Sequence, residues 1–222
     1  QHAYKEFVLK RFLILGVGGL GSRLALELAA LGAKELFIVD NDIIETSNLQ
    51  RMFWTTSGDL GKKKTTLIKD KIAEISPLTI VHTSELDSIT YCHNAELKDF
   101  DFIFITADAD DGSMSDKVGE ILWKSSIPHL IGGYWEASLL VGPLIDKNSK
   151  TSLFDMHTRF SEKFRPLIKR DFIPPSIGAS NSIIAGIMIN ECIKYFVSNK
   201  CSLIDRQLLI DLLTLRHQII AI

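Results

Sequence analysis

The sequence predicts an α/β fold with a mostly parallel sheet and a C-terminal antiparallel portion, and three observations lead to this prediction. Short apolar runs alternate with stretches of helical spacing along residues 11–126. A glycine-rich turn joins the first apolar run to the first helical stretch. Residues 207–220 return to strand-like patterning. With 222 residues, of which 46% are hydrophobic, the chain can bury one substantial core, so we expect a single domain over residues 1–222.

The first elements form a strand, a helix and a second strand. "RFLILG" at residues 11–16 is a fully apolar run that ends in glycine. "SRLALELAALG" at residues 22–32 has helical spacing and is closed by Gly32, a typical helix stop. "KELFIVD" at residues 34–40 indicates a second buried strand. A strand-helix-strand unit of this kind has a right-handed crossover and parallel strands, which predicts a Rossmann-like half.

The same alternation continues along the chain. Residues 148–175 are polar, basic and aromatic with weak periodicity, so we expect a crossover loop over the face of the sheet. The other expected elements are a helix at 61–76 that stops before Pro77, strands at 78–86 and 99–108, a helix at 115–126, a strand-rich stretch at 127–145 with a break at Gly132-Gly133, a helix at 180–196 and late strands at 207–220.

Composition excludes several classes of protein. The formal net charge of -2 gives no global attraction to nucleic acid or anionic membranes. Cys92, Cys192 and Cys201 are far apart and form no CxxC pair, which argues against a disulfide framework and a cysteine-rich zinc site. No apolar run approaches the roughly 20 residues that a membrane span needs, and no signal-peptide pattern opens the sequence. We expect a soluble, cytoplasmic protein without nucleic-acid or membrane partners.

The glycine-rich turn "GVGGLG" indicates a phosphate-binding loop. Gly16, Gly18 and Gly21 satisfy G-x-G-x-x-G, which lets the backbone approach phosphates at a helix N-terminus. Asp40 ends the next strand, where an acidic residue accepts hydrogen bonds from ribose hydroxyls. Both NAD and ATP carry that ribose, so the loop alone leaves the two ligands open.

Polar residues downstream favour ATP. Asn48 and Arg51 are three residues apart and share one side of a helical turn. An arginine holds phosphate oxygens bidentately, and Lys64 adds a point charge. Asp108 ends an apolar strand, at the edge where open α/β sheets bind ligands, and its carboxylate suits Mg²⁺ with substrate phosphates. A plain dehydrogenase has no need for this set.

Four segments in order, "GVGGLGS", "VDNDIIETSNLQR", "DLGKKKTTLIK" and "ITADAD", resemble the E1-like superfamily of ThiF, MoeB and ubiquitin-activating enzymes, which adenylates carboxylates. The peptide-modifying branch of MccB and PaaA is the most similar. The resemblance implies attack of a substrate carboxylate on the α-phosphate of ATP. It implies that the nucleotide loop consists of Gly16, Gly18, Gly19 and Gly21, that Asp40 binds the ribose, and that Asp42 assists near the site. It also implies that the phosphates are contacted by Asn48 and by the catalytic residues Arg51 and Lys64, and that catalytic Asp108 holds Mg²⁺.

The sequence also departs from the superfamily. Many members bind structural zinc through two CxxC pairs, but "SKTSLFDMH" stands where the first pair would fall, so no zinc is expected. Ubiquitin-type members carry a catalytic cysteine after the adenylation motifs, whereas none occurs between Cys92 and Cys192, and Cys192 fits a buried helix position. The chain begins with Gln1, which leaves open a preceding leader-binding domain of the kind found in MccB.

We therefore expect a homodimeric adenylyltransferase that acts on a short ribosomally made precursor peptide. Adenylation of its carboxylate would lead to nucleotidyl transfer or to dehydrative cyclisation in the maturation of a peptide antibiotic or related natural product. The main alternative within the superfamily is adenylation of the C-terminus of a sulfur-carrier or ubiquitin-like protein. Two other classes stay open, namely an NAD-dependent oxidoreductase and a non-catalytic scaffold subunit.

Overall fold

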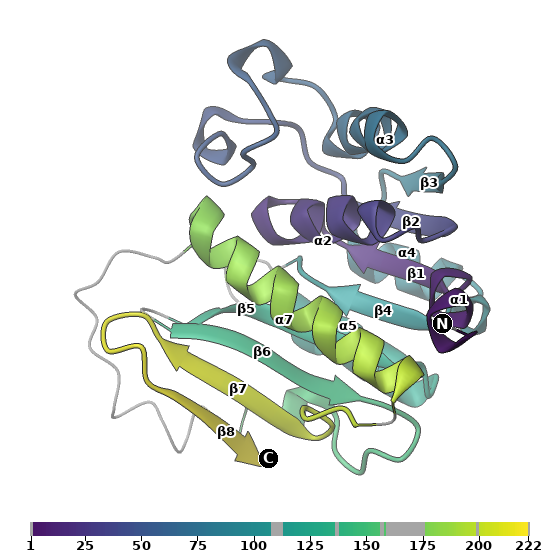
Figure 1. Ribbon diagram of the computed structural model, residues 1–222, viewed down its shortest axis with the longest axis vertical. Coiled ribbons are helices and arrows are strands. Elements are labelled where there is room, and N and C mark those ends of the chain that lie inside the picture. Colours follow the sequence, from purple (N-terminus) through teal and green to yellow (C-terminus); the bar gives the residue numbers. More distant parts are fainter. Residues whose placement is uncertain are drawn as a thin grey trace.

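The computed structural model describes residues 2–107, 113–135, 138–155, 158, 176–198 and 200–221. Within these residues, one eight-stranded sheet runs through the molecule (Figure 1). Its strands are β1 (Arg11–Leu15), β2 (Glu35–Val39), β3 (Ile80–Ser84), β4 (Phe102–Ile105), β5 (His129–Trp135), β6 (Ser138–Ile145), β7 (Arg206–Asp211) and β8 (His217–Ala221).

The strand order is β3-β2-β1-β4-β5-β6-β7-β8. The first five strands in this order are parallel, and the pairs β5-β6, β6-β7 and β7-β8 are antiparallel. Parallel neighbours need a crossover, and helices supply it here. Of the antiparallel neighbours, β5-β6 and β7-β8 are close in sequence, whereas α7 lies in the chain between β6 and β7. The α/β fold with a mostly parallel sheet and a C-terminal antiparallel portion is therefore confirmed.

Helices cover both faces of the parallel part of the sheet. Figure 1 shows α2 and α7 crossing in front of the sheet and α4 and α5 behind it. The described helices and 3-10 turns are α1 (His2–Val8), α2 (Gly19–Ala30), η1 (Thr46–Asn48), η2 (Ser57–Asp59), α3 (Lys64–Ile75), α4 (Ser88–Asn94), η3 (Leu97–Asp99), α5 (Ser113–Lys124) and α7 (Gly178–Val197).

Strand β1 explains why the first apolar run is continuous rather than alternating. Phe12 and Ile14 belong to the core under α2 and α7, while Leu13 and Leu15 belong to the core under α4 and α5. All four side chains have no exposed surface. A parallel strand between two helical layers buries both of its faces, so every position is apolar.

Two short helices, α1 and α4, were not predicted. Each has seven residues, too few for a clear helical period. Helix α4 begins at an Asp87 N-cap, whose Oδ1 accepts the Thr90 N–H at 2.9 Å. The predicted break at Gly132-Gly133 was wrong, because β5 runs through both glycines and only its register with β6 shifts between Leu130 and Gly132.

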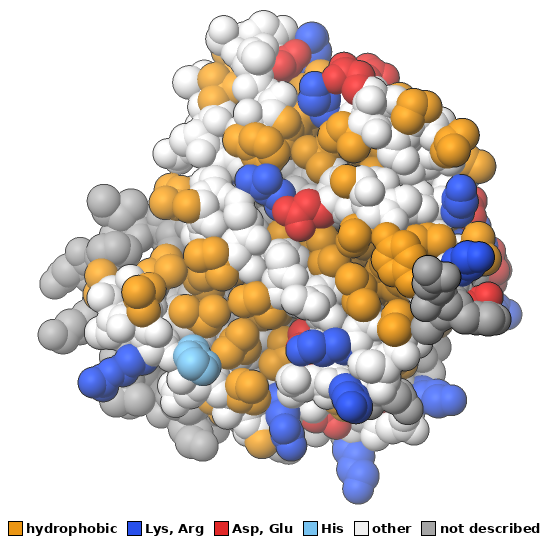
Figure 2. All heavy atoms as spheres, in the orientation of Figure 1, with side chains coloured by type: hydrophobic (Ala, Val, Ile, Leu, Met, Phe, Trp, Pro, Cys, Tyr) orange, Lys and Arg blue, Asp and Glu red, His pale blue; other side chains and the backbone are white. Residues whose placement is uncertain are grey.

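The antiparallel end of the sheet is less covered than the parallel part. Figure 2 shows hydrophobic side chains gathered over β7 and β8, beside α7. Ile219 on the edge strand β8 is 50% exposed. Of the predicted crossover loop at 148–175, residues 153–155 are helical, and most of the remainder lies outside the described residues. No helix in the described ranges has the length and apolar character required to span a lipid bilayer.

Candidate active site

A cavity of about 540 Å³ opens at the carboxyl ends of the parallel strands. This is the edge where open α/β sheets bind ligands. The glycine turn after β1, the end of β2, the end of β4 and the middle of β5 all contribute to its walls. The predicted site residues that line it are Gly16, Gly18, Gly19, Asp40, Asp42, Arg51 and Lys64.

The glycines of the turn are needed for different reasons. Gly16 has φ +89°, and a Cβ there would lie 2.5 Å from Ala107 Cβ. Gly21 lies against the turn itself, since a Cβ would stand 1.8 Å from the Gly16 carbonyl oxygen. A Cβ on Gly18 would meet nothing within 4 Å. Gly18 therefore has free space on its Cβ side and lines the main cavity, where another molecule can approach the backbone.

Gly19, the first residue of α2, provides space for two side chains. A Cβ on Gly19 would lie 2.5 Å from Asn181 Nδ2 and 3.1 Å from Arg51 Cγ. The N–H groups of the first turn of a helix have no acceptor within the helix and attract anions. Arg51 and Asn181 therefore meet at the positive end of α2.

Asp40 fastens the glycine turn to the end of β2. Its Oδ2 accepts the Val17 N–H at 2.7 Å, and its Oδ1 accepts the Asp42 N–H at 2.9 Å. The side chain is only 9% exposed. Each carboxylate oxygen has a second lone pair, so Asp40 keeps the capacity to accept a ligand hydroxyl while holding the turn.

Lys64 is a buried cation at the start of α3. Its Nζ lies 2.7 Å from Asp42 Oδ2, and its backbone N–H donates to the Asp42 carbonyl oxygen at 3.2 Å. The Lys64 side chain is 8% exposed, whereas the Asp42 side chain is 63% exposed. The ion pair holds the ammonium group at the cavity wall while Asp42 is open to solvent.

A second cavity of about 300 Å³ adjoins the first. Asp42, Arg51 and Lys64 line both cavities, and Asn48 lines the second one. Asn48 is 4% exposed, and its Oδ1 accepts the Glu45 N–H at 3.3 Å as part of a capping box around η1. The predicted shared side of Asn48 and Arg51 is thus present, with Asn48 anchored and Arg51 at the cavity.

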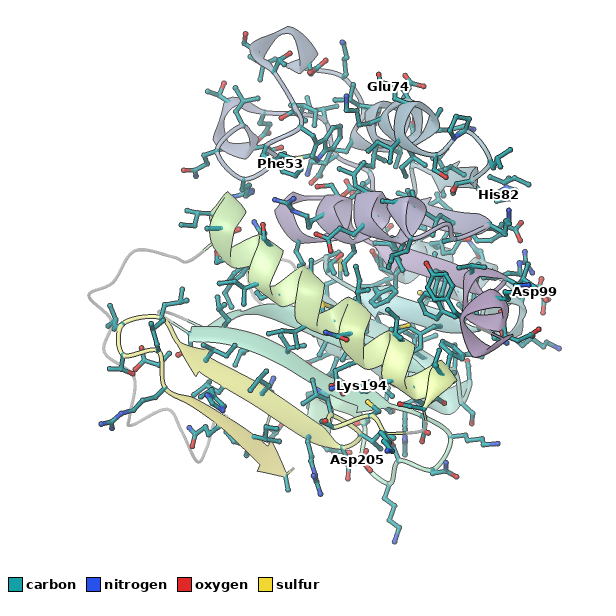
Figure 3. The ribbon with its side chains drawn as sticks, in the orientation of Figure 1. Phe53, Glu74, His82, Asp99, Lys194 and Asp205 are labelled. Carbon is teal, nitrogen blue, oxygen red and sulfur yellow. The ribbon has the colours of Figure 1, made fainter. Side chains whose placement is uncertain are left out.

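The segment that carries Arg51 is attached to α2. Trp54 Nε1 donates to Ser22 Oγ at 3.0 Å, and the Arg23 guanidinium lies 3.8 Å from the centre of the Phe53 ring. In Figure 3, Phe53 lies above the N-terminal end of α2. These contacts hold the segment, and Arg51 with it, against the N-terminal part of α2. Within the described part of the chain, the Arg51 guanidinium has no hydrogen bond or ion pair.

Several cavity residues were not predicted from the sequence. Tyr134 on β5 donates its hydroxyl hydrogen to Asn181 Oδ1, and burial raises the pKa of Tyr134 to about 12. Asp87, Thr106 and Gln207 also line the main cavity. No spacing pattern marks them, because they lie on separate elements. Gly21 packs beside the cavity rather than lining it, and predicted Asp108 lies outside the described residues.

The three cysteines lie in protected positions. Burial raises the pKa of the Cys92 and Cys201 thiols to about 12, and raises that of the fully buried Cys192 as well. A thiol with a raised pKa carries little of the reactive thiolate. None of the three lines either cavity among the described residues.

Several curated proteins with similar sequences are named as adenylyltransferases. Identity is 51% over 65 residues with a probable molybdopterin-synthase adenylyltransferase of Porphyra purpurea, covering 29% of this chain and 17% of that protein. It is 42% over 76 residues with the probable adenylyltransferase/sulfurtransferase MoeZ of Mycobacterium tuberculosis, covering 34% and 19%. It is 37% over 65 residues with the sulfur carrier protein ThiS adenylyltransferase of Escherichia coli, covering 29% and 26%.

Solved structures share the fold over almost the whole chain. A crystal structure of E. coli MccB with ATP superposes with a TM-score of 0.82 at 22% identity, covering 99% of this chain and 65% of that one. A crystal structure of PaaA superposes with a TM-score of 0.78 at 23% identity, covering 100% and 67%. The chain therefore spans about two thirds of these structures. The family model of the ThiF family matches residues 3–222, and the chain belongs to this family.

Proposed function

We propose that this chain is an ATP-dependent adenylyltransferase that activates a carboxylate. The observation that carries the proposal is the main cavity. It brings the glycine turn, Asp40, Arg51 and Lys64 to one point at the carboxyl edge of the sheet. An anion-binding helix end, a ribose acceptor and two cations are the groups that a nucleoside triphosphate requires.

Each group has a role in this proposal. The backbone at Gly18 and the N-terminus of α2 hold phosphate oxygens, and Asp40 accepts a ribose hydroxyl. Arg51 and Lys64 neutralise the phosphate charge that develops as the α-phosphate is attacked, which lowers the barrier electrostatically. The acceptor carboxylate forms a bond to the α-phosphorus while the bond to pyrophosphate breaks. An acyl adenylate and pyrophosphate result, so no protein nucleophile is required.

Asp108 would hold Mg²⁺. Among the other carboxylates of the cavity, Asp40 already accepts two backbone N–H groups, Asp42 pairs with Lys64, and Asp87 accepts the Thr90 N–H. Thr106 and Ala107, which precede Asp108, line the cavity. Within the described ranges, no three His, Cys, Asp or Glu side chains gather as metal ligands. Mg²⁺ usually takes one or two carboxylates plus substrate phosphates, so a single carboxylate here fits its chemistry.

We further propose that the acceptor is a short ribosomally made peptide. Structures of MccB with its MccA peptide and of PaaA match 99% and 100% of this chain, which supports a peptide acceptor. The raised pKa values of all three thiols argue against a thioester relay. The product would be a nucleotidyl peptide or a cyclised peptide. Adenylation of a sulfur-carrier C-terminus is the second candidate, because relatives such as the ThiS adenylyltransferase are named for it.

Mass spectrometry tests this proposal. A short peptide encoded next to the gene, or a sulfur-carrier protein in a parallel reaction, is incubated with ATP, Mg²⁺ and the full-length protein. We expect the peptide to gain the mass of AMP or to lose water with release of AMP. Arg51→Ala should reduce product formation about 100-fold or more, whereas Arg216→Ala, in the exposed turn between β7 and β8, should not.

The outcomes separate the candidates. Modification of the carrier protein and not of the peptide would overturn the peptide assignment and keep the adenylyltransferase. If neither acceptor changes and ATP is not consumed, the enzymatic proposal fails and a scaffold role replaces it.

We also propose that the protein is a homodimer that works in the cytoplasm. The apolar side chains that gather over β7 and β8 support an interface (Figure 2). Ile219 on β8 is 50% exposed. Three cysteines without disulfides fit a reducing compartment. Analytical ultracentrifugation should give twice the monomer mass, and Ile219→Lys should shift the equilibrium toward monomer.

A further inference from the structure

The side chain of Asn181 has an unusual environment for a buried amide. It lies in the first turn of α7 and is 1% exposed. Its Oδ1 accepts the hydroxyl hydrogen of Tyr134. Its Nδ2 is buried and has no hydrogen-bond partner within the described residues. A buried donor without an acceptor is destabilising, so the position calls for an explanation.

Support for Tyr134 does not explain the amide. An oxygen is all that the Tyr134 hydroxyl needs, and a carboxylate or hydroxyl side chain would supply one without an unpaired N–H. The amide differs from such groups by its donor, and that donor is directed at the first residue of α2. Nδ2 would be 2.5 Å from a Cβ on Gly19.

Asn181 Nδ2 lies at the N-terminus of α2, beside Gly19. Gly19 begins a 12-residue helix, whose first N–H groups have no intrahelical acceptor. The Arg51 side chain lies beside the same residue. Its Cγ and Cβ are 3.1 and 3.2 Å from the point that a Cβ added to Gly19 would occupy. Gly19, Arg51 and Asn181 all line the main cavity. A helix N-terminus, a cation and an unpaired amide donor therefore converge.

We propose that Asn181 is a nucleotide-binding residue whose Nδ2 donates a hydrogen bond to a phosphate oxygen at the N-terminus of α2. The inference rests on the proposed ATP site. Asn181 Nδ2 and Arg51 Cγ lie 2.5 and 3.1 Å from the same point beside Gly19, so a phosphate that the Arg51 guanidinium attracts to the α2 N-terminus comes within reach of Nδ2. Asn181 and Arg51 then act as one pair of donors, and the acceptor that the buried amide requires is part of the substrate.

Isothermal titration with ATP, AMP and adenosine tests the proposal on the full-length protein. Asn181→Asp keeps the size and the oxygen that Tyr134 uses but replaces the donor with an anion. We expect its ATP dissociation constant to rise at least tenfold, because charge-assisted hydrogen bonds contribute about 1.5–3 kcal/mol. Adenosine should bind as to wild type, and AMP identifies whether the α-phosphate is the one contacted. Asn181→Ala, which adds no charge, should weaken ATP binding by a smaller factor and should likewise leave adenosine binding unchanged.

Asn94→Asp is the matched control. Asn94 is exposed at the end of α4 and lines neither of the two cavities. The same amide-to-carboxylate change there should leave ATP affinity within about threefold of wild type. An equal loss in both variants would attribute the effect to the added negative charge and overturn the assignment. Unchanged ATP affinity in Asn181→Asp and Asn181→Ala would also overturn it, while ATP binding by wild type preserves the proposed site. If wild type binds no ATP, both proposals fail.

Discussion

At the scale of single residues, the G-x-G-x-x-G spacing predicts where glycine is required but not why. Gly16 needs its positive φ, Gly21 allows α2 to approach the turn, and Gly18 is open to the cavity. Gly19, which is outside the three motif positions, is required because Arg51 and Asn181 fill its surroundings. Sequence spacing could indicate Asp40, but its second task, holding the Val17 N–H, depends on a turn that only the folded chain forms.

Two alanine substitutions should separate these roles. Gly21→Ala places a Cβ 1.8 Å from a carbonyl oxygen, and we expect it to lower the free energy of unfolding by about 3 kcal/mol or more. Gly18→Ala meets no atom within 4 Å and should cost less than about 1 kcal/mol, while ATP affinity falls. Urea denaturation and ATP titration of both variants provide the check. Equal stability losses would contradict the separate roles.

At the scale of elements, the segment between β2 and α3 positions the cations of the site. Its ends are joined by the Ile44 N–H to the Lys62 carbonyl at 2.8 Å and the Gly61 N–H to the Ile44 carbonyl at 2.9 Å. The part between them packs on α2 through Phe53 and Trp54. The sequence marked this segment by its polar residues. Its path could not be predicted, because it follows contacts with α2 rather than a periodic pattern.

The turn at η2 gives this segment a dependence on pH. Hydrogen bonds from Lys62 and then from Thr56 lower the pKa of Asp59 to about 2. The folded-state pKa is below the unfolded value of about 4, so the stabilisation is present above pH 4 and is lost as the pH falls toward 2. We expect the carboxyl carbon of Asp59 to titrate near pH 2 in NMR spectra. A midpoint near 4 would show that the turn does not hold the carboxylate.

At the scale of the whole molecule, the sequence predicted the sheet well because apolar runs such as 11–16 are buried on both faces. It also predicted the edge at which the main cavity opens, since parallel strands bring their carboxyl ends together. Helices α1 and α4 are too short to show a period. Asn181 and Tyr134 meet only after α7 packs across the sheet, although they are 47 residues apart in the chain. No local pattern could pair them.

The core contains a buried histidine that makes the folded protein less stable as the pH falls. His129 is buried at the start of β5, and desolvation lowers its pKa to about 4, against a hydrogen bond with the Ile127 carbonyl that acts in the other direction. The unfolded chain gains this proton near pH 6.5 and the folded chain does not. The free energy of unfolding should therefore fall between pH 6.5 and 4, and fall less in His129→Gln. Parallel pH profiles in urea denaturation would contradict this.

The central claim is that the cavity is an ATP site in which Arg51 contacts the phosphates. The alternative is an NAD site that the glycine turn forms without Arg51. Calorimetric titration of the full-length protein with ATP and with NAD⁺ tests it most directly. We expect ATP to bind more tightly than NAD⁺, and Arg51→Ala to weaken ATP at least tenfold while Arg216→Ala leaves it unchanged. Tighter binding of NAD⁺, or an Arg51→Ala protein that binds ATP as wild type does, would contradict the account.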